Sequence, residues 1–276
     1  MNAEDRSVAD AVATQREPIA RVIALTGDAF RRGGRLFYVG AGTSGRLGVL
    51  DASECPPTFG SDPEMVQGII AGGFPALLRA QEGAEDSPAG GAAVMDEHGV
   101  EPRDIVVGIA ASGTTPFVHG AIERARTRGA RTAIVACTPV PPTLLANVDE
   151  AIIAIVGPEV VTGSTRLKAG TATKMVLNMI TTGAMIRIGK TYGNLMVDLR
   201  ATNEKLRDRS ERIVVEVCGV SRDEARALLA SADRSVKTAI VMQKLGVDRA
   251  AAEEALAAAG GVIRRVVSDA PPPVVT

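Results

Sequence analysis

Residues 36–45 read LFYVGAGTSG, an aliphatic run that leads directly into a glycine-rich loop. A short aliphatic run without polar alternation is typical of a buried strand in a parallel sheet. Similar runs follow along the chain at residues 66–70, 105–109, 132–136 and 151–156. Because helical patterns separate most of these runs, the sequence predicts an α/β fold, a doubly wound parallel sheet flanked by helices.

Helical patterns also precede and follow the predicted sheet. Between residues 7 and 32 apolar residues recur at helical spacing, and Pro18 either kinks this helix or starts a second one. Residues 168–188 and 195–217 each have a helix pattern, and a capping box at Ser221 opens three short helices. We therefore predict an N-terminal helical segment at 1–34, an α/β domain at 35–217, a small three-helix module at 218–268 and a frayed tail at 269–276.

The composition narrows the class of protein. The 31 basic and 32 acidic residues nearly cancel, which argues against a nucleic-acid partner. Cys55, Cys137 and Cys218 are far apart and lack metal-ligand spacing, so a reducing compartment is expected. The first residues show no signal-peptide pattern, and no apolar run reaches the ~18 residues of a membrane span. We therefore expect a soluble, cytoplasmic protein.

Glycine and hydroxyl residues follow three of the predicted strands, in the loops 40–45, 111–116 and 161–165. In a parallel sheet the carboxyl ends of the strands gather at one edge, where ligands bind. Glycine lets the backbone approach an anion closely, and hydroxyl and helix-start N–H groups donate to phosphate oxygens. The alternative is that these residues only cap helices. The candidate phosphate-binding residues are Gly42, Thr43, Ser44, Ser112, Thr114, Thr115, Ser164 and Thr165.

The first loop also has the form G-x-G-x-x-G, which is the fingerprint of dinucleotide-binding folds. Such folds place an acidic residue after the second strand, about 20 residues beyond the glycines. Here Asp62 and Glu64 precede the second strand instead. Thr43 and Ser44 at the variable positions suit a phosphate monoester, so we expect no nicotinamide or flavin cofactor.

Acidic clusters at residues 51–54 and 82–86 border the segments that lead to the sheet edge. Such carboxylates are ordinarily solvated helix caps. Glu54, however, stands beside Cys55 and Pro56, and we expect its partial burial to raise its pKa, as an acid–base catalyst requires. The two histidines, His98 and His119, lack metal-ligand partners at useful spacing, so we expect both to be structural and predict no metal site.

Long strings of this sequence closely resemble N-acetylmuramic acid 6-phosphate etherases, which belong to the sugar-isomerase (SIS) fold group. The resemblance runs from about residue 4 to 267 and implies an SIS-type domain with Ser/Thr phosphate loops, a small C-terminal helical domain and a homodimer. The strings that carry it are 38–48, 51–58, 82–86, 108–113, 160–171, 193–198 and 201–206.

The resemblance also implies an activity and the residues that perform it. The expected reaction removes D-lactate from the amino sugar by elimination and then adds water, in the recycling of cell-wall sugars, without metal or cofactor. The family's proton donor falls at Glu54 and its second catalytic carboxylate at Glu85, which we assign as the base at C2. Lys168, in the string 160–171, is added to the phosphate-binding residues.

The sequence departs from the family pattern at two places. Thr114 stands where these etherases usually have an arginine, which removes a possible anion contact, and the chain begins later than typical members. Two alternative functions remain open. One is a non-catalytic sugar-phosphate-binding regulator, like the glucokinase regulatory proteins, and the other is an aldose–ketose phosphosugar isomerase.

Overall fold

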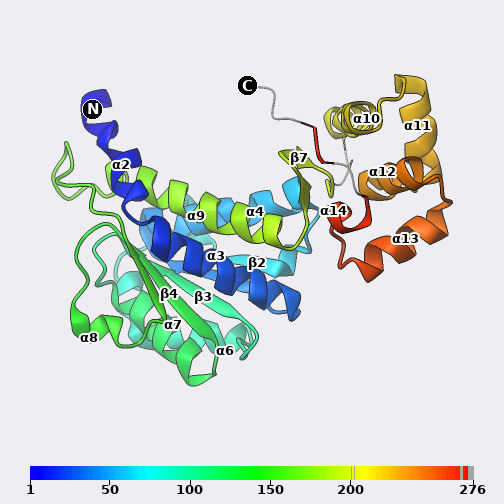
Figure 1. The fold of residues 1–276 in the computed structure, drawn as a ribbon. Helices are drawn as coiled ribbons and strands as arrows, with labels where there is room; N and C mark the ends of the chain where they lie inside the picture. The colour runs from blue at the N-terminus through cyan, green and yellow to red at the C-terminus, as the bar shows by residue number, and fades with distance from the viewer. Residues whose placement is uncertain (200, 202, 268–269, 273–276) are drawn as a thin grey trace. The chain divides into compact units, whose positions relative to one another are not determined.

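The computed structural model describes residues 1–199, 201, 203–267 and 270–272 (Figure 1). Packing divides the chain into two units. The first unit comprises residues 1–54 and 63–184, and the second comprises residues 55–62 and the part of the chain from 185 onward.

A five-stranded parallel sheet forms the centre of the first unit. Its order, β2-β1-β3-β4-β5, reverses between β1 and β3, because the chain leaves β1 toward one edge and returns on its other side. This reversal is the point where open α/β sheets bind ligands. All five strands were predicted from the aliphatic runs, and their bounds are β1 Leu36–Gly40, β2 Val66–Ile70, β3 Ile105–Ile109, β4 Arg131–Ala136 and β5 Glu150–Ile153.

Helices cover both faces of this sheet, as a doubly wound fold requires (Figure 1). Phe37 packs toward one face, in an apolar cluster with Met95 and Phe117 of α6 and α7. Tyr38 points to the opposite face, where its hydroxyl donates to the carbonyl of Leu177 in α9 at 3.3 Å. The bounds are α3 Arg16–Arg31, α4 Gly42–Phe59 and α9 Lys168–Arg187 on the Tyr38 face, and α6 Pro88–Glu97 and α7 Pro116–Thr127 on the Phe37 face.

Shorter helices complete the first unit. Pro18 lies in the first turn of α3, where the missing N–H is harmless, so it begins a second helix and does not kink a single one. The short elements are α1 Asn2–Asp5, α2 Ser7–Ala13, α5 Pro75–Leu78, α8 Pro142–Leu145 and the 3₁₀ turns η1 Pro63–Met65 and η2 Ala84–Asp86.

The second unit contains a small hairpin and a group of helices. The capping box predicted at Ser221 is present, with Glu224 as its second member. The predicted helix 195–217 is wrong in its first part, because Gly193 turns the chain with φ +63° into a hairpin and the helix begins only after the Asn203 cap. The bounds are β6 Thr191–Tyr192, β7 Leu195–Met196, α10 Glu204–Cys218, α11 Arg222–Ser231, α12 Val236–Leu245, α13 Arg249–Ala258 and α14 Ile263–Val266.

The division predicted at residue 217 stays a prediction, but α10 packs with the helices that follow it. Ile213 and Val214 of α10 share an apolar core with Ile240 of α12. Of the predicted tail, residues 269 and 273–276 lie outside the described residues. Pro271 is described and lies beside the hairpin, since a Cβ on Gly193 would lie 2.9 Å from the Cβ of Pro271, and the fraying of the tail stays a prediction.

Candidate functional site

The first glycine-rich loop joins β1 to α4 in a very tight turn. Gly42 has φ +52°, a conformation that favours glycine. A Cβ on Gly45 would lie only 2.6 Å from Cγ1 of Ile70 and 2.8 Å from the carbonyl oxygen of Gly40. The turn therefore places Thr43 and Ser44 in the first turn of α4, where helix N–H donors face the carboxyl edge of the sheet.

The second loop follows β3, on the other side of the point where the strand order reverses. The Oγ of Ser112 accepts hydrogen bonds from the N–H and the hydroxyl of Thr114, at 3.3 and 3.2 Å. Thr115 is the N-cap residue of α7, yet its side chain makes no capping bond. His119 holds this loop through a 2.7 Å contact between Nε2 and the carbonyl of Gly113, which agrees with its predicted structural role.

The third loop lies beside the first. A Cβ on Gly170 would be 3.7 Å from Cγ2 of Thr43 and 3.5 Å from the carbonyl oxygen of Thr165. The start of α9 is thus close to the start of α4, as the sequence predicted. Ser164 is half-buried and Thr165 is exposed, so both hydroxyl residues of this loop are reachable from solvent.

The start of α9 already has an acidic partner from the chain itself. The carboxylate of Glu159 accepts from the N–H groups of Lys168 and Ala169, each at 2.9 Å. The Nζ of Lys168 is buried and donates to Glu4 at 2.8 Å, and this contact lowers the pKa of Glu4. A phosphate contact from Lys168, as predicted, requires this ion pair to open.

Glu85 lies at the same edge of the sheet as the first loop. It belongs to the turn η2 and lines a cavity of about 220 Å³ together with Gly42, Glu82 and Arg46. The guanidinium of Arg46 is fixed by bonds to the carbonyls of Ala76 and Leu77, at 2.6 and 3.1 Å. Arg46 was not among the residues predicted for the site. Its position two residues after Ser44, in the first turns of α4, could have indicated that it lies near the predicted phosphate loop.

Glu54 is exposed, so its predicted partial burial is wrong for the single chain. The buried acidic residue of α4 is Asp51, which accepts a 2.6 Å bond from Nδ2 of Asn178 in α9. Burial raises the pKa of Asp51. Neighbours in sequence do not determine burial on a helix, because the inward-facing residues recur every three or four positions. In α4 the buried residues include Asp51 and Cys55.

Two further findings concern ligands and membranes. Within the described part of the chain, no group of three or more His, Cys, Asp or Glu residues could hold a metal ion. None of the helices among the described residues is long and apolar enough to cross a membrane.

Comparison with known proteins assigns the chain to a family. Residues 18–126 match the sequence model of the glucokinase regulatory protein N-terminal SIS domain. The N-acetylmuramic acid 6-phosphate etherase of Synechococcus elongatus is 54% identical over 267 residues, covering 97% of this chain and 87% of that protein. The etherase of Aliivibrio fischeri is 53% identical over 270 residues, covering 98% and 89%. The chain therefore belongs to the N-acetylmuramic acid 6-phosphate etherase family.

Proposed function

We propose that this protein cleaves the D-lactyl ether of N-acetylmuramic acid 6-phosphate and releases D-lactate and N-acetylglucosamine 6-phosphate. The observation that carries this proposal is the 54% identity to an etherase over 97% of the chain. Because the match covers 97% of the chain, it extends over the parallel sheet and the loops that follow its strands. The enzyme is a carbon–oxygen lyase of amino-sugar catabolism.

The phosphate of the substrate binds at the carboxyl edge of the sheet. The first turn of α4 offers N–H donors with the hydroxyls of Thr43 and Ser44, and the helix dipole favours an anion there. Ser112, Thr114 and Thr115 of the second loop approach from the opposite side of the strand reversal. Ser164 and Thr165 complete the group, because the third loop adjoins the first.

The reaction divides into an elimination and a hydration. Opening of the sugar ring gives an aldehyde that acidifies the proton on C2, and Glu85 removes this proton as a base. The electron pair forms the C2–C3 double bond while the C3–O bond breaks, and Glu54 protonates the departing oxygen of lactate. Water then adds its hydroxyl to C3 and its proton to C2, so one water molecule is consumed for each ether cleaved.

Thr114 has a specific consequence within this scheme. The resemblance to these etherases leads us to expect an arginine there, whereas the threonine hydroxyl of this chain donates to Ser112. Arg46 is a cation already fixed on the cavity that contains Glu85. We propose that Arg46 supplies positive charge near the substrate and compensates in part for the missing arginine.

We also propose that the enzyme is a cytoplasmic homodimer. Both the dimer and the cytoplasmic location are expected from the resemblance to the etherase family. The α/β unit that carries the hydroxyl loops and the helical second unit correspond to the two domains expected in each subunit.

One observation favours a second function. The match of residues 18–126 to a regulatory-protein domain is compatible with a non-catalytic sensor of sugar phosphates. Such a sensor would bind phosphosugars at the same loops without the proton transfers that Glu54 and Glu85 provide. It would bind the substrate and release nothing.

The test is an assay of D-lactate after incubation of the purified protein with N-acetylmuramic acid 6-phosphate. We expect stoichiometric D-lactate without added metal or nucleotide, and the same rate in the presence of EDTA. N-acetylglucosamine 6-phosphate, which has no lactyl ether, is the matched control. Tight binding without lactate would favour the sensor, and a ketose product without lactate would favour an isomerase.

A further inference from the structure

The segment that leads from β2 to Glu85 passes through the short helix α5, which has little apolar packing of its own. Of the four residues of α5, only Ala76 is buried. Leu78 is 77% exposed, and Phe74, just before the helix, is 74% exposed. A single helical turn is unstable by itself, because helix nucleation is unfavourable. Apolar burial therefore does little to hold α5, and a polar anchor has to fix its position.

Arg46 of α4 supplies this anchor. Its Nη2 donates to the carbonyl of Ala76 at 2.6 Å, and its Nε donates to the carbonyl of Leu77 at 3.1 Å. The last carbonyls of a helix have no partner within the helix, and an arginine that reaches them stabilises the helix end. Because the guanidinium is planar and makes both bonds with one edge, it fixes the orientation of α5 as well as its distance from α4.

A second contact closes the loop that contains α5. Gly72, with φ +83°, lies directly against Gln81, because a Cβ on Gly72 would be 2.9 Å from Cβ and 3.0 Å from Cγ of Gln81. The chain thus leaves and returns at one place, as in an Ω-loop. Arg46 holds the middle of this loop, and the contact between Gly72 and Gln81 forms its base.

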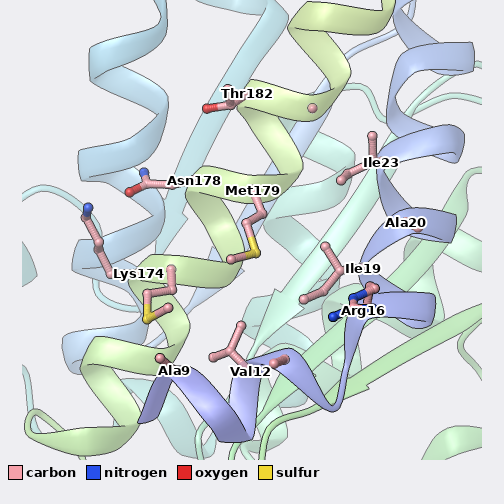
Figure 2. A pocket seen from close by; sticks show the side chains of 13 residues that line it. Ala9, Val12, Arg16, Ile19, Ala20, Ile23, Lys174, Asn178, Met179 and Thr182 are labelled. Carbon is pink, nitrogen blue, oxygen red and sulfur yellow. The ribbon is translucent and has the colours of Figure 1, made fainter. Parts of the chain in front are cut away.

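The same loop leads directly to Glu85, which comes four residues after Gln81. Arg46, Gln81 and Glu85 line one cavity of about 220 Å³. A larger groove of about 740 Å³ between α9 and the helices α2 and α3 is mostly apolar, and its described lining residues include no carboxylate (Figure 2). The cavity at the loop is therefore the one equipped for proton transfer. Glu85 is exposed, so its place depends on the backbone that carries it.

We propose that Arg46 is a positioning residue for Glu85: by holding α5, it fixes the loop that leads to the base relative to the phosphate site. The inference rests on the proposed function and adds to the charge that Arg46 supplies there. Thr43 and Ser44 lie on the same first turns of α4 as Arg46. Covalent bonds set the distance from the phosphate to C2 in the substrate, so the base has to stand at a matching distance. A misplacement of about 1 Å can cost ~10²-fold in rate.

The variant Arg46→Lys separates position from charge. Lysine keeps the positive charge but has no planar edge with which to hold both carbonyls. We expect kcat for D-lactate release to fall by ~10²-fold, with KM and the affinity for N-acetylglucosamine 6-phosphate close to those of the wild type. Arg79→Lys is the matched control, because Arg79 lies in the same loop and its exposed side chain is not among those that line the cavity. It should keep the wild-type kcat.

A pair of glycine variants tests the same loop without altering Arg46. Gly72→Ala pushes against the side chain of Gln81, whereas a Cβ on Gly73 would meet its nearest neighbour, Cδ of Pro75, at 4.0 Å. Both glycines have a positive φ, +83° and +66°, so each alanine suffers backbone strain. Only Gly72→Ala displaces the base of the loop. Its kcat should therefore fall well below that of Gly73→Ala, and this pair decides the matter if Arg46→Lys does not fold.

Rescue by small cations completes the test. Guanidinium chloride at concentrations that do not unfold the protein should restore lactate release to Arg46→Ala, whereas ammonium chloride should not, because only guanidinium has the planar donor edge. Wild-type kcat in Arg46→Lys, a change confined to KM, or equal kcat in the two glycine variants would overturn the inference and leave the proposed function intact. Absence of lactate release by the wild type would defeat the proposed function itself, and the inference with it.

Discussion

At the scale of single residues, Asp51 and Glu54 differ in burial although both belong to one helix, α4. Asp51 is buried and accepts a hydrogen bond from Asn178, while Glu54 is exposed to solvent. Substitution of Asp51 should therefore affect stability, whereas substitution of Glu54, the proposed acid, should affect activity. The same inward position makes Asp51 sensitive to pH.

Asp51→Asn should change how stability depends on pH. Burial raises the pKa of Asp51 in the folded state, so the folded protein favours the protonated carboxyl. The contribution of Asp51 to the free energy of unfolding is therefore fully present below the pKa of the unfolded state and is lost as the pH rises through the pKa of the folded state. An amide at this position still accepts from Asn178 but does not ionise. The variant should therefore have a higher free energy of unfolding than the wild type at pH 7, and the difference should shrink at pH 4.

Urea unfolding at the two pH values measures this difference. A variant less stable than the wild type at pH 7 would mean that the ionised carboxylate strengthens the bond to Asn178 by more than its burial costs.

Ser44→Ala and Ser112→Ala test the phosphate loops. Each removes one hydroxyl donor to a charged group, so substrate binding should weaken by roughly 1.5–3 kcal/mol in each variant. Ser231→Ala is the control, because its hydroxyl bonds only a carbonyl within the helix α11. Calorimetric titration with N-acetylglucosamine 6-phosphate gives the affinities. Unchanged affinity in both loop variants would reduce these hydroxyls to structural roles.

At the scale of helices and strands, local patterns were sufficient for most of the fold. Aliphatic runs predicted every strand of the main sheet, and helical spacing predicted α9 to within a residue of its end. The hairpin at residues 191–196 was missed because its apolar residues also fit a helix pattern. The turn at Gly193 depends on its positive φ angle, which the sequence does not reveal.

The candidate site was predictable only where it depends on local sequence. The hydroxyl loops follow strands, so their convergence could be inferred from the parallel sheet alone. The ion pair between Lys168 and Glu4 could not, because it joins residues 164 positions apart. The carboxylate of Glu159 at the start of α9 was missed for a related reason, since the intervening loop has no regular pattern.

Gly120→Ala should disrupt the packing of α6 against α7. A Cβ at this position would lie 2.0 Å from the carbonyl oxygen of Pro88, which is backbone and cannot rotate away. We expect a loss of about 1–3 kcal/mol in the free energy of unfolding, despite alanine's better helix propensity. Denaturant unfolding provides the measurement.

Gly170→Ala in α9 is the matched control for this helix packing. Its Cβ would meet its neighbours at 3.5 Å or more, which is ordinary contact, so propensity alone should decide. Stability should stay equal or rise by up to about 1 kcal/mol. Equal effects of the two substitutions would show that the close approach of α6 and α7 does not limit stability.

At the scale of the whole molecule, function depends on bringing distant groups to one sheet edge. The parallel sheet gathers the phosphate loops and Glu85 within one chain, whereas the length of α4 keeps Glu54 away from them.

The measurement that tests the central claim most directly follows the reaction in deuterated water by NMR, for the wild type, Glu85→Gln and Glu54→Gln. The wild type should release lactate and place deuterium at C2 of the product. Glu85→Gln should lose both lactate release and C2 exchange, because no base removes the proton. Glu54→Gln should lose lactate release yet retain exchange at C2, because proton removal comes first. Near-normal lactate release by either variant, or exchange that survives in Glu85→Gln but not in Glu54→Gln, would contradict the account.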